Sequence, residues 1–97
     1  MVMILNIQEI KEQIRRIAQR GERGIALTKH CRERMIERNV DINDILHVLN
    51  WGNVAHDPDE NSDMKFKVQG NDLEGEPLCV VFIILDQESL LGITVHE

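Results

Sequence analysis

A row of one histidine and two arginines is the strongest candidate for chemistry in this sequence. His30, Arg34 and Arg38 lie four residues apart in the stretch HCRERMIER. If the stretch is a helix, a turn of ~100° per residue places the three along one flank, while Cys31 and Met35 point toward the core. Imidazole exchanges a proton near neutral pH, and guanidinium groups bind phosphate through paired hydrogen bonds. The row could therefore act on a phosphate.

The same row also has a purely structural explanation. Like charges four residues apart destabilise a helix by ~0.2–0.5 kcal/mol per pair, so something must compensate the two arginines. Glu33 and Glu37 can pair with them locally, and acids after residue 40 can pair with them across the fold. The residue types alone leave both explanations open.

The charge distribution predicts a basic surface in spite of an acidic total. The 97 residues carry a net charge of -6, which argues against binding to nucleic acid. Residues 1–40 nevertheless hold nine Lys and Arg against five acids, whereas residues 41–97 hold two Lys against twelve acids. We expect a basic face that meets an anion and an acidic face that repels it or attracts a basic partner, unless the two faces pair with each other.

The sequence contains no pattern for a metal or another cofactor, and we expect neither. Cys31 and Cys79 lie far apart without a C-x-x-C pair, and H-E-x-x-H is absent. The acidic segment 57–63 spaces its oxygens as a calcium loop does. It has Ser62 in place of the glycine at position six and Val68 in place of the final glutamate.

Three helices are predicted in the first half of the chain. Asn6, with Glu9 three residues on, is the expected cap of a helix over residues 7–20, which carries isoleucines at helical spacing. Thr28 is the expected cap of a second helix that carries the row. Asp41 caps a third helix, which ends at residues 50–52. A short extended piece at residues 25–27 separates the first two helices.

After residue 52 the period of the apolar residues changes from 3.6 to 2, which predicts a sheet. Residues 64–68 alternate, residues 78–85 form an unbroken apolar run typical of a central strand, residues 90–95 form another strand, and residues 53–56 a weaker one. We predict one α+β domain over residues 1–97, with the N-terminal helices packed on one face of an antiparallel sheet of three or four strands. The predicted core consists of Ile10, Ile14, Met35, Ile45, Leu49, Phe66, Val80, Phe82, Ile84 and Ile93.

The segment around the row resembles a bacterial family catalogued as domain of unknown function 4258. The resemblance rests on LTKH at residues 27–30, on ERM and ER at 33–38, and on the later pieces FKV and ITV with Gly70 and Gly75 between them. It spans residues 25–95, and residues 1–24 then form an N-terminal helical extension of a family-like core at 25–97.

This resemblance implies a RelE-like fold and a function similar to the RelE and MqsR toxins, which are ribonucleases of toxin–antitoxin pairs. Matched residue by residue, the family motif falls on His30, Arg34 and Arg38. In metal-independent RNA cleavage His30 would act as the acid or base, and the arginines would bind the phosphate. Lys65 and Lys67, on the polar face of a strand, would extend the RNA path.

The implied partners are RNA or the ribosome, and an antitoxin with a small zinc-binding module and a helix-turn-helix. Two features depart from the toxin pattern. The chain is acidic, and it has no Tyr, so that stacking on RNA bases falls to Trp51, Phe66 or Phe82.

Two other functions stay open on this evidence: a non-catalytic module whose basic helix binds an acidic partner, and an inactive toxin that still binds its antitoxin. No apolar run approaches the ~20 residues that span a bilayer, and the first five residues lack the basic flank of a signal peptide. We therefore expect a cytoplasmic protein without membrane contact.

Overall fold

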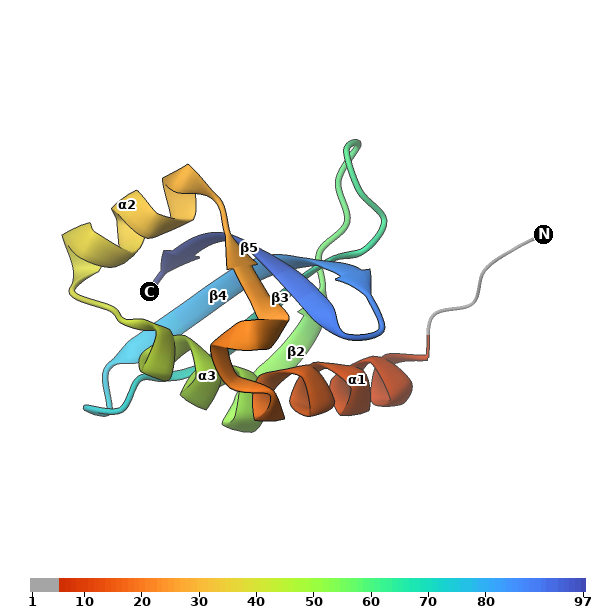
Figure 1. Ribbon diagram of the computed structural model, residues 1–97, viewed down its shortest axis with the longest axis horizontal. Coiled ribbons are helices and arrows are strands. Elements are labelled where there is room, and N and C mark those ends of the chain that lie inside the picture. The colour runs from red at the N-terminus through yellow and green to blue at the C-terminus, as the bar shows by residue number, and fades with distance from the viewer. Residues whose placement is uncertain (1–5) are drawn as a thin grey trace.

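A five-stranded sheet forms one layer of the computed structural model, which describes residues 6–97, and three helices form the other (Figure 1). The strand order is β1-β5-β4-β3-β2. The elements, in chain order, are α1 (Ile7–Gln19), a 3₁₀ turn η1 (Gly21–Gly24), β1 (Ile25–Leu27), α2 (Lys29–Arg38), α3 (Ile42–Trp51), β2 (Asn53–His56), β3 (Lys65–Asn71), β4 (Pro77–Asp86) and β5 (Ser89–His96). The predicted α+β class is confirmed.

The sheet has one strand that the prediction did not include. β1 pairs in parallel with β5, in the register Ile25 with Leu90 and Leu27 with Gly92, so the sheet is mixed. The other three pairings are antiparallel, as predicted. A strand of three residues is too short to show a period of 2, and its pairing depends on a distant part of the chain.

The caps of the three helices are those that the sequence predicts. The side chains of Asn6, Thr28 and Asp41 each accept a backbone N–H in the first turn of α1, α2 and α3. α2 ends at Asn39, whose φ of 56° is left-handed, a conformation that asparagine tolerates better than most residues. The chain therefore turns sharply between α2 and α3.

The helices and the sheet bury one shared core. Phe66 and Val68 of β3 point into it, as do alternate residues of β4, and Cys31 of α2 joins them. Nine of the ten predicted core residues are buried. Ile93 is only half-buried, because it is the extra residue of a β-bulge where the register of β4 and β5 shifts.

Gly52 marks the closest approach of the end of α3 to the sheet, and it generates a test of the packing. A Cβ on Gly52 would lie 2.5 Å from Cγ1 of Val68 and 2.8 Å from the carbonyl oxygen of Gln69. We expect Gly52→Ala to lower the free energy of unfolding by ~1–3 kcal/mol, measured by urea denaturation, because neither neighbour can move freely. Asn53, the exposed residue next to Gly52, serves as a control. Asn53→Ala should change the free energy of unfolding by less than ~0.5 kcal/mol. A Gly52→Ala protein more stable than wild type would contradict this packing.

Candidate functional site

The first turn of α2 is tied to β5, and this contact positions the histidine and arginine row. Thr28 Oγ1 accepts the N–H of Cys31 at 3.0 Å and donates to the carbonyl oxygen of Ile93 at 3.2 Å. The N–H of Thr28 donates to the carbonyl oxygen of Gly92 at 3.0 Å. Cys31 is fully buried, and a Cβ on Gly92 would lie 3.4 Å from its Sγ. The helix therefore lies close against the strand with one face fixed toward the core.

The row reaches solvent from one flank of α2, as the helical spacing predicts. His30 and Arg38 are exposed, and the side chain of Arg34 is 34% exposed. A rise of 1.5 Å per residue separates successive members of the row by ~6 Å along the helix axis. An RNA backbone that runs along the helix can therefore reach more than one of them.

Only one residue of the row is ion-paired within residues 6–97. Arg34 Nη1 lies 3.0 Å from Oε2 of Glu37, and both groups are partly exposed. Surface pairs of this kind contribute ~0–1 kcal/mol, so Arg34 can exchange Glu37 for a phosphate at little cost. His30 is exposed and does not face the core. Ion pairing with nearby carboxylates, the structural explanation of the row, therefore accounts only for Arg34 among the three residues in the described part of the chain.

The ion pairs of the described residues are local in sequence. They join Lys29 to Glu33, Arg34 to Glu37, and Lys65 to Asp57 and Asp59. Within that part of the chain none connects the basic residues before 40 to the acidic residues after it. The basic residues before 40 and the acidic residues after it therefore do not neutralise each other through ion pairs in the described part of the chain.

Lys65 and Lys67 are not brought together with the row. Their strand alternates, and since Phe66 and Val68 point into the core beneath the helices, both lysines lie on the helix-free face of the sheet. Lys65 Nζ lies 3.1 Å from Asp59 Oδ2, and the Lys65 side chain is 22% exposed. An RNA that touched both the row and the exposed Lys67 would have to pass around an edge of the sheet.

Asp59, the closer partner of Lys65, belongs to the acidic loop after β2. The backbone N–H of Asn61 and the Lys65 ammonium group hold the pKa of Asp59 below its usual value. The carboxylate is therefore ionised at neutral pH, and Lys65 serves to anchor this loop to β3.

The aromatic residues offer little stacking surface near the row. Phe66 and Phe82 are buried, which excludes both from contact with RNA bases. Trp51 is 78% exposed, but it ends α3, whose ten residues extend ~15 Å away from the end of α2. Contacts to the phosphate backbone are thus what the α2 surface can supply.

The two cysteines are buried thiols with no sign of reactivity. Burial raises the pKa of Cys31 and of Cys79, so both stay protonated at neutral pH, whereas a nucleophile or metal ligand needs the thiolate. Residues 6–97 contain no group of three His, Cys, Asp or Glu placed to hold a metal ion. No helix among these residues is long and apolar enough to cross a membrane.

Three residues outside the predicted site shape the other flank of α2. Ile36 is the most exposed large hydrophobic residue of α2, and Leu73 projects from the β3–β4 loop. Asp44 is buried and accepts the N–H of Asp41 and of Leu73, each at 3.0 Å. An acid three residues after the Asp41 cap is a capping-box signal. The hydrogen bond from Leu73 to Asp44 joins residues 29 positions apart, so no local sequence pattern predicts it.

The row thus belongs to an α+β domain in which all the helices share one face of a mixed sheet. The chain belongs to the family described as Domain of unknown function (DUF4258), whose model matches residues 27–96, from the end of β1 to the end of β5. The row lies inside the matched segment and α1 lies before it. No curated protein and no solved structure matches the chain.

Stability measurements separate the two explanations of the row. Because Arg34 and Arg38 are solvent-facing, we expect Arg34→Ala and Arg38→Ala each to change the free energy of unfolding by less than ~0.5 kcal/mol in urea titrations. Thr28→Val, which leaves the Cys31 N–H without its cap, should cost ~1–2 kcal/mol in the same assay. A loss of that size for either arginine would instead show that the row stabilises the fold.

Proposed function

We propose that the protein is the toxin of a toxin–antitoxin pair and cleaves RNA without a metal at the α2 row. The observation that carries the proposal is the exposure of His30, Arg34 and Arg38 along one flank of a helix that is fixed to the sheet. Membership of the family supports the proposal in so far as all three residues lie inside the matched segment 27–96. The likeness to the RelE and MqsR toxins that the sequence suggests assigns the chemistry to the same row.

The chemistry of this proposal follows from the residue types. The His30 imidazole takes the proton from an RNA 2′-hydroxyl, the 2′-oxygen attacks the adjacent phosphorus, and the bond from phosphorus to the 5′-oxygen breaks. The leaving oxygen takes a proton from water. Arg34 and Arg38 bind the non-bridging oxygens and stabilise the charge that builds on the phosphate. The products are a 2′,3′-cyclic phosphate and a 5′-hydroxyl.

The acidic remainder of the chain sets the conditions for this activity. Residues 41–97 carry twelve acids against two lysines, so long free RNA is repelled from most of the surface. RNA presented on the ribosome is a substrate that can reach a single helix without crossing the acidic surface. We expect an antitoxin with a zinc-binding module and a helix-turn-helix to be the neutralising partner.

The alternative function uses the same helix without cleavage. The row would bind acidic side chains of a partner protein, either as a dedicated binding module or as an inactive toxin that keeps its antitoxin. The surface pair between Arg34 and Glu37 favours this alternative, because it shows that the row already accepts a carboxylate. Activity that depends on His30 separates the two functions, since carboxylate binding needs the arginines and no proton transfer.

Cleavage assays with purified protein, free RNA and ribosomes test the proposal. We expect His30→Ala to reduce the cleavage rate by ~10²–10⁴-fold with little change in RNA affinity, the usual effect of losing a general acid or base. The double variant Arg34→Ala, Arg38→Ala should lower affinity and rate together and make the dependence of affinity on salt shallower. Lys67→Ala is the control, since it lies on the other face of the sheet and should leave both unchanged. No cleavage with or without ribosomes would refute the catalytic proposal.

A further inference from the structure

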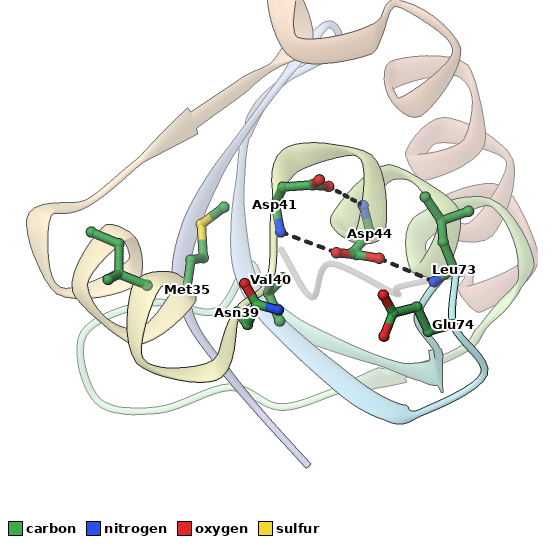
Figure 2. A pocket seen from close by; sticks show the side chains of 8 residues that line it. Met35, Asn39, Val40, Asp41, Asp44, Leu73 and Glu74 are labelled. Atoms are coloured by element: carbon green, nitrogen blue, oxygen red, sulfur yellow. Dashed lines mark hydrogen bonds between the residues drawn. The ribbon is translucent and has the colours of Figure 1, made fainter.

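A groove lies on the other flank of α2, between this helix and the β3–β4 loop (Figure 2). Met35 stands on one side, Leu73 and Glu74 on the other, and Asp41 and Asp44 between them. The cavity measures about 460 Å³. Ile36, Asn39 and Val40 complete its lining.

The two rims of the groove expose large apolar side chains. Ile36 of α2 is 80% exposed and Leu73 of the loop is 59% exposed, while Met35 and Val40 present apolar surface between them. Single exposed hydrophobic residues are common, but two that flank one groove form a patch that gains free energy when covered. An occupant with its own apolar side chain would bury both rims at once.

The charged residues that line the groove are all acidic. Asp41, Asp44 and Glu74 contribute three carboxylates, and the lining includes no Lys, Arg or His. Asp44 is buried and accepts two backbone N–H groups but forms no ion pair within residues 6–97. The carboxylates do not converge as a metal site does in the described residues. Charge complementarity therefore requires an occupant whose positive charges are spread along the groove.

The backbone N–H groups along the groove already have acceptors within the protein. The N–H groups of Asn39 and Val40 donate to α2 carbonyl oxygens, and those of Asp41 and Leu73 donate to Asp44. The N–H of Glu74 donates to a side chain of its own loop. An extended peptide that adds a strand needs free partners on the sheet edge, whereas a helix satisfies its own backbone.

We propose that this groove binds a basic amphipathic helix of a partner protein. Apolar side chains of the helix pack between Ile36 and Leu73, and its Lys or Arg side chains pair with Asp41 and Glu74. The proposal does not depend on RNA cleavage, because at ~100° per residue Ile36 lies on the flank of α2 opposite Arg34 and Arg38. The flank of α2 with Arg34 and Arg38 thus stays free for an anion, while the opposite flank forms one wall of the acidic groove for the partner helix.

A defined peptide tests this proposal on the full chain. The probe is a 16-residue synthetic helix with leucines at i, i+3, i+4 and i+7 bordered by arginines, and a second peptide replaces every arginine with glutamate. In ¹H–¹⁵N titrations we expect the basic peptide to give saturable shifts in the end of α2 and in the β3–β4 loop. The acidic peptide should give none there. No saturable shift with the basic peptide, or equal shifts in the groove with both peptides, would overturn the proposal.

Surface variants with matched controls locate the contact. Ile36→Ser and Glu74→Lys change exposed side chains, so the fold should survive, and each should weaken peptide binding by roughly tenfold or more. The controls are Leu85→Ser, at a residue 52% exposed at the end of β4, and Glu88→Lys in the β4–β5 turn. Binding weakened as much by the controls as by the groove variants would show that the peptide does not occupy the groove.

Discussion

Thr28 joins the start of α2 to β5, and the positions of the histidine and arginine row and of the acidic groove depend on that contact. Its hydroxyl caps the helix and at the same time donates to the Ile93 carbonyl oxygen, so the helix cannot rotate about its axis without breaking one of these bonds. Burial of Cys31 against Gly92 fixes the same orientation through packing. With one face of α2 held in the core, its two flanks necessarily point in different directions.

The two flanks of α2 differ in charge. One carries the row of His30, Arg34 and Arg38, and the other faces the acidic groove that ends at Glu74. The ion pairs of residues 6–97 are local, so none of them joins the basic first part of the sequence to the acidic second part. An overall net charge of -6 is therefore a poor guide to what α2 can bind.

Local signals explain which parts of the structure the sequence could predict. Caps at Asn6, Thr28 and Asp41 and the change of period after residue 52 identify the helices and four of the strands, because these features depend on near neighbours. The helical repeat likewise places the row on one flank. β1 could not be assigned to the sheet, since its pairing with β5 joins residues 65 positions apart. The groove escaped prediction for the same reason, because Ile36 and Leu73 line one groove only in the folded chain.

The chemistry at the ends of RNA fragments tests the central claim most directly. RNA incubated with the protein, with ribosomes where needed and with EDTA present, would be analysed by mass spectrometry beside the same reaction with His30→Ala. The account predicts 2′,3′-cyclic phosphate and 5′-hydroxyl ends from the wild-type protein and almost none from the variant. Fragments with 5′-phosphate ends, or the same ends at the same rate from His30→Ala, would contradict it.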